Sequence, residues 1–261
     1  MLLPGDVQQV RDRAEQPACL HSGRTWYGKP LHLHGHRGKC LGIRAHFRPV
    51  PLLLREGLIA VGSVNQRDAI DPSWVARVLA APPGVGPVRL VCVDGPAGSG
   101  KTTFASAFAA ALTPHLEIVH VVHGDAVYEG WDVVADAPDR IAAFSWLATR
   151  IEQWLIDPWR LGRAGEHPVW DWHTSRWGST QTVTCEGVVI LEGVGLGSRA
   201  LREQAALCVW VEADPTTRLA RVLRRDGDAI GDHMRAWQSD EEVWHQIDAT
   251  RDGSDLRIAT S

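Results

Sequence analysis

Residues 95–102 of the chain, Gly-Pro-Ala-Gly-Ser-Gly-Lys-Thr, match the pattern G-x-x-x-x-G-K-[ST] in full. Glycines allow a backbone to turn back on itself, so that successive N–H groups converge on one anion. A helix that begins directly after such a turn points the positive end of its dipole at the same anion. The stretch therefore predicts a main-chain cradle for a polyphosphate group.

The last two residues of the pattern add side-chain chemistry to this cradle. We expect Lys101 to neutralise the β- and γ-phosphate oxygens, and the Thr102 hydroxyl to take a position on Mg²⁺. ATP and Mg²⁺ are therefore the expected cofactors. The residues expected to bind nucleotide are Gly95, Pro96, Ala97, Gly98, Ser99, Gly100, Lys101, Thr102 and Thr103.

The scarcity of lysine supports this interpretation. The chain has only three lysines, Lys29, Lys39 and Lys101, and every other cation after residue 60 is an arginine. Arginine and lysine are not interchangeable, because a compact ammonium fits where a planar guanidinium does not. A single lysine in residues 61–261 thus indicates a place that requires an ammonium group.

The segments around the motif predict an α/β fold. Residues 88–93 form a continuous apolar run before the motif, which is typical of a buried parallel strand, and residues 102–112 follow as an alanine-rich helix. Further strands are expected at 118–123, 188–191, 207–211 and 256–258, and further helices at 74–79, 139–156, 215–225 and 231–245. We expect Pro158 to end the helix that starts at residue 139. Alternating strands and helices predict three layers, with a mostly parallel central sheet covered on both faces.

Composition divides the chain into two parts. Residues 1–60 hold nine Lys or Arg and four Asp or Glu, whereas residues 61–261 hold 18 and 27. The first part shows no lasting helical or strand periodicity, so we expect a poorly ordered or appended segment at 1–60 and one domain at 61–261. The acidic body argues against a nucleic-acid partner, and no run of about 18 apolar residues suggests a membrane span. Five scattered cysteines and the lack of a signal sequence predict a cytoplasmic location.

Two acidic residues follow predicted strands. Asp125 lies at the end of the second strand, and Glu192 directly follows the apolar run at 188–191. Ligands gather at the carboxyl ends of parallel strands, where a carboxylate can accept a proton from an attacking hydroxyl or hold Mg²⁺ through water. Alternatively, each acid only caps a turn.

A cluster of arginines occupies the helix predicted at 215–225. Spacings of three and four residues place Arg218, Arg221 and Arg225 on one face of this helix. Arginines that close over a γ-phosphate stabilise the charge that develops during transfer. The alternative is a solvated basic face.

These motifs resemble those of the uridine kinase group of P-loop kinases, over about residues 88–258. Asp125 and Tyr128 match that family's D-x-[FL]-Y element, and Asp171 within Trp170-Asp171-Trp172 is similar to its Y-D-[FW] element. Glu192-Gly193 resembles its E-G element, and residues 214–226 resemble its arginine-bearing lid helix. The resemblance implies a P-loop NTPase fold and transfer of the γ-phosphoryl group of ATP to a small hydroxyl metabolite, most often a nucleoside.

The same resemblance assigns roles to individual residues. It implies that Asp125 is the catalytic base, that Lys101, Arg218, Arg221 and Arg225 serve the phosphoryl group, and that Thr102 and Glu192 lie at the metal. Tyr128, Trp131, Asp171 and Trp172 are the expected substrate contacts. The chain departs from the family at Ala126 and Trp170, and these departures concern the acceptor rather than the phosphate chemistry.

Other functions stay open at this point. The opening Asp94-Gly95-Pro96 also resembles cytidylate kinases, whose nucleoside monophosphate acceptor requires a cluster of arginines. An ATPase switch, or a protein that holds nucleotide without turnover, would need no acceptor pocket. The sequence leaves the oligomeric state undecided.

Two further sets of residues have simpler interpretations. His32, His34, His36 and Cys40 could form a metal site, but no strand pattern supports one. We interpret Trp74, Trp146, Trp154, Trp210 and Trp244 as core residues. Trp131, Trp170 and Trp172 fall instead near the expected acceptor site.

Overall fold

A computed structural model describes residues 70–130 and 141–261 of the chain. The boundary expected between residues 60 and 61, the His32–Cys40 cluster and Trp131 lie outside these described residues. None of the described helices is long and apolar enough to cross a bilayer.

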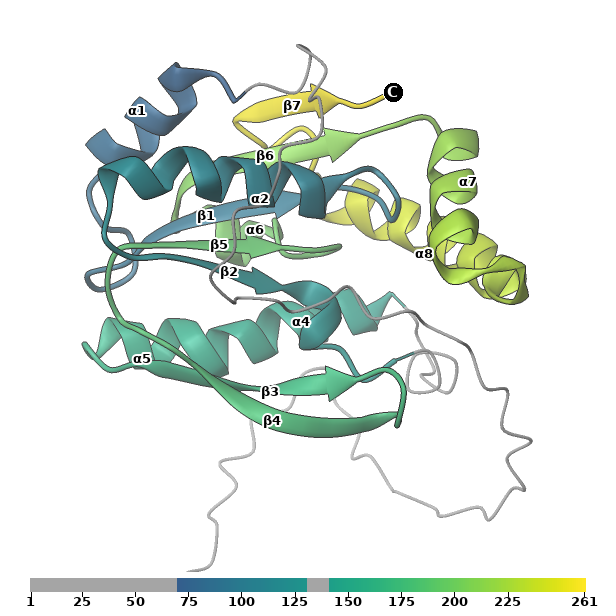
Figure 1. Cartoon of the computed structure of the whole chain (residues 1–261), viewed down its shortest axis with the longest axis horizontal. Coiled ribbons are helices and arrows are strands. Elements are labelled where there is room, and N and C mark those ends of the chain that lie inside the picture. The colour runs from purple at the N-terminus through teal and green to yellow at the C-terminus, as the bar shows by residue number, and fades with distance from the viewer. Residues whose placement is uncertain (1–69, 131–140) are drawn as a thin grey trace, which may run out of the picture. The chain divides into compact units, whose positions relative to one another are not determined.

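The described residues form a five-stranded sheet with helices on both faces (Figure 1). The strands are β1 (Arg89–Asp94), β2 (Val119–His123), β5 (Val188–Glu192), β6 (Ala205–Glu212) and β7 (Leu256–Ala259). Their order is β2-β5-β1-β6-β7, and every neighbouring pair is parallel. The predicted three-layer α/β P-loop fold with a mostly parallel sheet is thus confirmed.

The helices follow the predicted order, with differences at their ends and with one short helix, α6, that was not predicted. They are α1 (Pro72–Ala80), α2 (Lys101–Leu112), α4 (Ala142–Ile151), α5 (Asp157–Arg160), α6 (Arg199–Arg202), α7 (Pro215–Asp226) and α8 (Gly231–Asp248). Asp214 caps α7, because its side chain accepts hydrogen bonds from the N–H groups of Thr216 and Thr217. Pro215 follows at the first helical position, where its missing N–H costs nothing.

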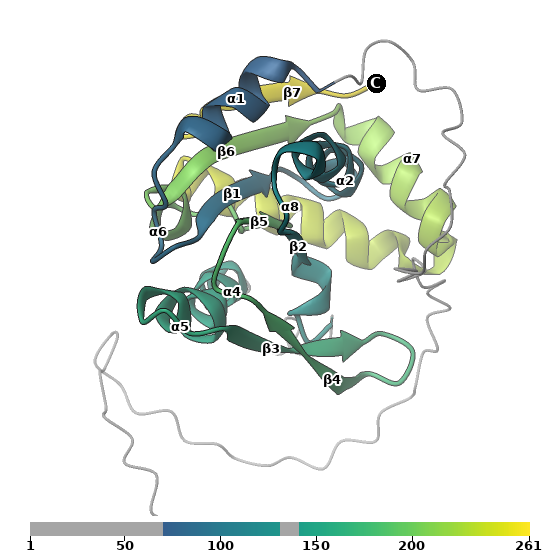
Figure 2. The same cartoon turned by 60° about the vertical axis from the view of Figure 1, so that its left-hand side comes forward.

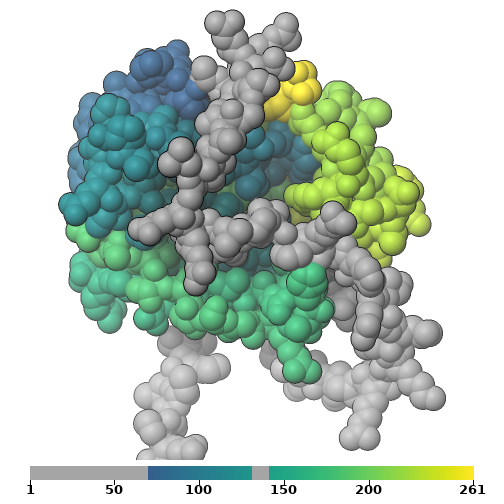
Figure 3. All heavy atoms as spheres, in the orientation of Figure 1, coloured from purple at the N-terminus to yellow at the C-terminus, as the bar shows by residue number. Residues whose placement is uncertain are grey.

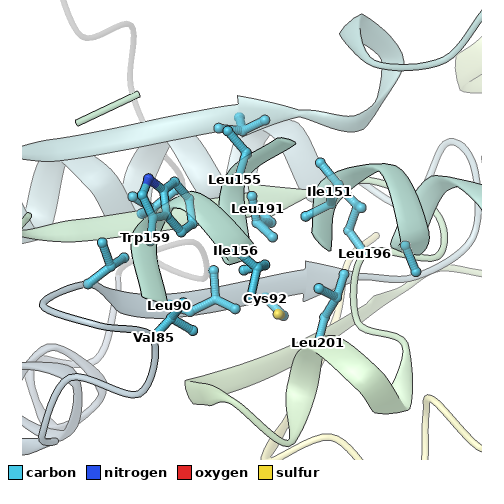
Figure 4. Close-up of a cluster of buried hydrophobic side chains, with 14 of the residues drawn as sticks. Val85, Leu90, Cys92, Ile151, Leu155, Ile156, Trp159, Leu191, Leu196 and Leu201 are labelled. Atoms are coloured by element: carbon cyan, nitrogen blue, oxygen red, sulfur yellow. The ribbon is translucent and has the colours of Figure 1, made fainter. Parts of the chain in front are cut away.

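Alternate residues of β1, β2, β5 and β6 pack into two separate hydrophobic cores. Val91 and Val93 of β1 pack with Phe104 and Phe108 of α2 on one face of the sheet. Leu90 and Cys92 point to the opposite face, because successive side chains of a strand alternate. On that face they join a cluster with the helical segment 147–159, as Figure 4 shows for Ile151, Leu155, Ile156 and Trp159.

The helical segment on the second face corrects one prediction. Pro158 does not end the helix, because α5 continues through it to Arg160. Between α4 and α5 lies a π-helical turn, Glu152–Ile156, and the N–H of Asp157 bonds to the carbonyl of Glu152, five residues back. A proline inside an α-helix collides with the carbonyl four residues before it. The wider turn shifts the hydrogen-bond ladder directly before Pro158 and lets the helix continue.

An antiparallel hairpin was not expected from the sequence. It consists of β3 (Gly165–Asp171) and β4 (Arg176–Val183), which pair from Gly165 opposite Val183 to Asp171 opposite Arg176. Figure 2 shows the hairpin beside α4 and α5, apart from the five-stranded sheet. The hairpin carries Trp170 and Trp177, whose rings meet edge to face with centroids 5.2 Å apart.

The tryptophans separate into buried and exposed members. Trp210 and Trp244 are buried, and Trp74 and Trp154 pack partly buried against the cores, as predicted. The prediction that Trp146 is a core residue is wrong, because its side chain is 47% exposed on the outer surface of α4. Trp159 is instead fully buried, and its indole N–H donates to the carbonyl of Val183, which ties α5 to the hairpin.

Replacing Trp159 by alanine should lower the free energy of unfolding by about 3–5 kcal/mol, because it leaves a cavity and an unpaired carbonyl. Trp146→Ala is the matched control and should change the free energy by no more than about 0.5 kcal/mol. Urea unfolding, followed by tryptophan fluorescence and circular dichroism, measures both. Equal losses in the two variants would contradict the assignment of Trp159 to the core.

Candidate active site

The phosphate-binding motif forms the connection between β1 and α2 at the carboxyl edge of the sheet. Gly98 has φ +78°, a left-handed conformation that favours glycine. A Cβ atom on Gly98 would lie 2.4 Å from the carbonyl oxygen of Arg218, so the loop packs directly on the backbone of α7. Gly100, with φ +99°, then caps α2. The motif thus has the expected setting of strand, glycine-rich turn and helix.

Ala97 is held by its two backbone polar groups. Its N–H donates to Glu241 Oε2 over 2.8 Å, and its carbonyl accepts a longer contact of 3.4 Å from Arg218 Nη1. Arg218 and Glu241 are themselves paired at 2.7 Å, and both are buried. Burial raises the pKa of the Glu241 carboxyl, while the Ala97 N–H and the nearby cations oppose this rise. A buried pair from α7 and α8 therefore supports the loop from behind.

Asp94, the last residue of β1, accepts hydrogen bonds from a second set of backbone N–H groups. Its fully buried carboxylate accepts hydrogen bonds from the N–H groups of Gly95, Gly195 and Gly197, over 2.6, 3.1 and 2.7 Å. His245 Nε2 of α8 lies 3.4 Å away. Burial alone would raise the pKa of Asp94, but the hydrogen bonds from His245, Gly197 and Gly95 outweigh it and lower the pKa. Asp94 thus ties the start of the phosphate loop to the loop that follows β5.

Lys101 and Thr102 lie at the start of α2. Lys101 is largely buried, and its Nζ donates to the carbonyl of Pro96 over 3.0 Å, which keeps the ammonium at the mouth of the loop. The Thr102 hydroxyl lies 3.2 and 3.3 Å from the two carboxylate oxygens of Glu192. Thr103 is exposed in the first turn of the same helix.

The oxygen atoms of Thr102 and Glu192 suit a magnesium ion. Mg²⁺ prefers oxygen ligands and usually takes only one or two from the protein, with substrate phosphates and water supplying the others. Within residues 70–130 and 141–261, no group of three or more His, Cys, Asp or Glu side chains could hold a metal ion by itself. The hydroxyl and carboxylate therefore fit a metal that is bound together with a nucleotide.

His123 joins this edge and was missed from the sequence. It is the last residue of β2, and its Nδ1 lies 2.6 Å from Glu192 Oε1. This hydrogen bond raises the pKa of His123, although partial burial acts against it. The sequence could have indicated His123 as a site residue, because it lies at the end of a predicted strand and two residues before Asp125.

Asp125 follows in a short 3₁₀ turn, Gly124–Ala126. The pKa of its carboxyl is raised, first because the surrounding protein hinders its solvation and then because Glu192 repels its negative charge. Arg225, Lys101 and His123 act in the opposite direction. The residue as a whole is nevertheless exposed to solvent, so a ligand can reach it. The structure thus brings Asp125 into the electrostatic reach of both Lys101 and Arg225.

The three arginines predicted for one face of α7 have different surroundings. Arg218 is buried behind the loop, whereas Arg221 donates to the carbonyl of Gly98 over 3.2 Å and to the hydroxyl of Thr260 over 2.9 Å. Arg225 pairs with Asp226 at 2.7 Å, and its side chain is half exposed. Figure 1 shows α7 standing beyond the arrowheads of β1, β5 and β6. The hydrogen bond to Asp226 and the charges of Asp125 and Glu192 raise the pKa of Arg225, so Arg225 lies within electrostatic reach of the acidic groups at this edge.

Aromatic rings lie beside Asp125. The indole N–H of Trp172 donates to the backbone carbonyl of Asp125 over 2.9 Å. The Tyr128 ring lies 6.3 Å from the Trp172 ring and 5.5 Å from the Trp237 ring, measured between centroids. Trp237 belongs to α8 and was not predicted for the site. Tyr128 and Trp172 thus adjoin the candidate base, as expected of substrate contacts.

Asp171 has a different environment. Its carboxylate accepts hydrogen bonds from the N–H of His173 over 2.8 Å and from the hydroxyl of Thr174 over 2.8 Å. These bonds, with the Thr174 hydroxyl first, lower the pKa of Asp171. The described contacts of Asp171 therefore stabilise the turn between β3 and β4.

In the space-filling view, two of the segments that supply the site form the lower edge and the right-hand side of the molecule (Figure 3). Green atoms at the lower edge belong to the segment that contains α4, α5 and the hairpin, and yellow-green atoms at the right belong to α7 and α8. The hairpin supplies Trp172, and the helices supply Arg225 and Trp237. The candidate site is thus built from segments far apart in the sequence.

Comparisons with known proteins agree with this geometry. A family model described as an AAA domain matches residues 91–244, which is more than half of the chain. No curated protein matches the sequence significantly. A structure described as a possible uridine kinase from Bacillus stearothermophilus is 17% identical with a TM-score of 0.51, and the match covers 72% of this chain and 96% of that one. Another, a proposed fructose transport system kinase from Silicibacter sp. TM1040, is 21% identical with a TM-score of 0.49, over 71% and 97% of the two chains. The first likeness shows a shared fold.

Replacing Glu241 by alanine should destabilise the protein by about 3–5 kcal/mol, because it leaves the buried Arg218 guanidinium without its counter-ion. It also removes the acceptor of the Ala97 N–H, so nucleotide affinity should fall as well. Glu152→Ala is the matched control, since Glu152 pairs with Arg160 on the surface, and should cost less than about 1 kcal/mol. Chemical denaturation and calorimetric ATP titration measure the two effects. A Glu241→Ala variant as stable as the control would show that the pair does not support the loop.

Proposed function

Because the chain belongs to the AAA-domain family of P-loop NTPases, we propose that it is a kinase that transfers the γ-phosphoryl group of ATP to a small hydroxyl metabolite. The observation that carries this proposal is the placement of Asp125. An exposed carboxylate lies at the carboxyl edge of the sheet, within electrostatic reach of Lys101, Arg225 and Glu192. A protein that only binds or hydrolyses nucleotide has no need of an exposed carboxylate beside the aromatic rings of Tyr128 and Trp172.

The proposed chemistry begins with the phosphates. The loop amides and Lys101 hold the β- and γ-phosphates, and the Thr102 hydroxyl and Glu192 hold Mg²⁺. When bound, Mg²⁺ neutralises charge on the phosphate oxygens. Catalysis then depends mainly on position and charge, since phosphoryl transfer requires little covalent participation by the protein.

Asp125 and Arg225 act on the moving group. Asp125 accepts the proton of the acceptor hydroxyl while the hydroxyl oxygen bonds to the γ-phosphorus and the bond from that phosphorus to ADP breaks. The raised pKa of Asp125 suits it to this role. Arg225 stabilises the charge on the phosphoryl oxygens during transfer. Arg218 and Arg221, which we also place in the catalytic set, act through the phosphate loop, because both donate to its carbonyl groups.

The acceptor is proposed to be a nucleoside or another uncharged ring compound. Tyr128 and Trp172 offer aromatic surfaces next to Asp125, and we include Trp131 and Asp171 as further substrate contacts. An acceptor that already carries a phosphate would need unpaired cations. Arg150 is instead held in a bidentate pair by Glu129, next to Tyr128 in sequence, which favours an uncharged acceptor over a nucleoside monophosphate.

The experiment that tests the proposed function is a screen for acceptor-dependent ADP release. Purified protein is incubated with Mg²⁺ and ATP or GTP, together with nucleosides, nucleoside monophosphates, vitamins or sugar alcohols. The proposal predicts that an uncharged hydroxyl compound accelerates ADP release and appears as its phosphate ester by mass spectrometry. Slow hydrolysis that no acceptor changes would favour an ATPase and overturn the kinase assignment.

Replacing Asp125 by asparagine should lower acceptor phosphorylation by about 10²–10⁴-fold, because it removes the proposed general base. ATP affinity should stay within about twofold, since the described contacts include no hydrogen bond between Asp125 and the phosphate loop. Asp252→Asn, which changes an exposed aspartate paired with Arg257, is the matched control. Single-turnover phosphorylation and ATP titration measure the two quantities. Unchanged phosphorylation in the Asp125→Asn variant would remove Asp125 from the mechanism.

A further inference from the structure

The register of the sheet brings His123 and Glu192 together. In the parallel pair of β2 and β5, His123 lies directly opposite Glu192, and both residues end their strands. Side chains at paired positions of neighbouring strands project to the same face. The backbone therefore determines that an imidazole stands next to the carboxylate proposed to hold Mg²⁺.

The contacts define the orientation of this carboxylate. Glu192 Oε1 lies 2.6 Å from His123 Nδ1, while both oxygens lie within 3.3 Å of the Thr102 hydroxyl. The Glu192 side chain is 6% exposed, whereas the His123 side chain is 40% exposed. A carboxylate oxygen can only accept, so Nδ1 carries the proton and donates. In the described structure His123 and Thr102 are thus the side chains that orient Glu192 by hydrogen bonds.

The negative charge of Asp125 makes this support important. Asp125 and Glu192 repel each other, and the repulsion contributes to the raised pKa of Asp125. A carboxylate that lost a hydrogen-bond donor would be free to rotate away from Thr102 and from its acidic neighbour. The imidazole, as a second donor beside the Thr102 hydroxyl, resists that rotation.

We propose that His123 is a positioning residue that holds Glu192 in the orientation required to bind Mg²⁺ with a nucleotide. This inference rests on the proposed function, because it takes Glu192 as a metal-side residue. The Nδ1 atom of His123 is engaged by Glu192, and Mg²⁺ prefers oxygen ligands, so His123 acts through the carboxylate and not on the metal.

The experiment compares His123→Leu, which lacks a donor, with His123→Asn, whose amide N–H can replace that of Nδ1. His120→Leu is the matched control, because His120 lies on the same strand and contacts Thr184 instead. Calorimetry measures ATP affinity with and without Mg²⁺, and Mn²⁺ electron paramagnetic resonance measures metal binding to the ATP complex.

The His123→Leu variant should bind the metal about 10–100-fold more weakly in the ATP complex, while its metal-free ATP affinity stays within about twofold. The His123→Asn variant should recover most of the loss, and the His120→Leu variant should resemble the natural protein. If the His123→Leu variant does not fold, His123→Phe provides a second side chain without a donor.

Two results would overturn the proposal. One is normal metal affinity in every folded variant that lacks the donor, and the other is a His123→Asn variant as defective as His123→Leu. The kinase assignment fails separately: if no acceptor is phosphorylated while His123→Leu still loses metal affinity, the role of His123 stands and only the reaction is wrong. If the natural protein binds no Mg²⁺ with ATP, both proposals fall.

Discussion

A backbone that turns its N–H groups toward a polyphosphate must have its other polar groups satisfied from behind, and the rest of this site depends on that support. Ala97, Gly98 and Ser99 each direct a carbonyl away from the mouth of the loop, and these accept hydrogen bonds from Arg218, Arg221 and Thr260. An unpaired buried carbonyl or amide costs as much as a lost hydrogen bond. Residues of α7 and α8, together with Thr260 directly after β7, thus support the loop from behind.

This arrangement gives charged residues two different tasks. Arg218, Glu241 and Asp94 are buried and act on the backbone, while Arg225 and Asp125 keep exposed surface at the edge of the sheet. Buried charges are tolerated when they are paired, as Arg218 is with Glu241. The separation explains how one site can hold so many ionisable groups and still present only a few of them to a substrate.

Most of the sheet and the helix α7 could be predicted because their signals are local. The apolar run before Gly95, the Asp214-Pro215 cap and the run before Glu192 each define an element within a few residues. The hairpin gave no such signal, since β4 is exposed along almost its whole length and β3 contains Pro168. Pro158, in contrast, gave a clear local signal that was wrong. The π-helical turn before it shifts the backbone hydrogen bonds, so the helix continues through the proline.

The candidate site was predictable only in part. Lys101, Thr102, Asp125 and Glu192 follow from a motif or from the end of a strand. The partners of Arg218 could not be predicted, because Glu241 lies 23 residues away on another helix, and only packing brings them together. His123 needed the strand register, since its importance comes from facing Glu192 and not from its neighbours in sequence.

The single lysine of the phosphate loop has a practical consequence. Lys101 is the only amine-bearing side chain after residue 39, and it is largely buried with its Nζ against the Pro96 carbonyl. An acylating reagent therefore has one target in this part of the chain, and a bound triphosphate would shield it. The extent of acylation at Lys101, measured on one peptide by mass spectrometry, thus reports directly on the fraction of molecules whose loop is filled.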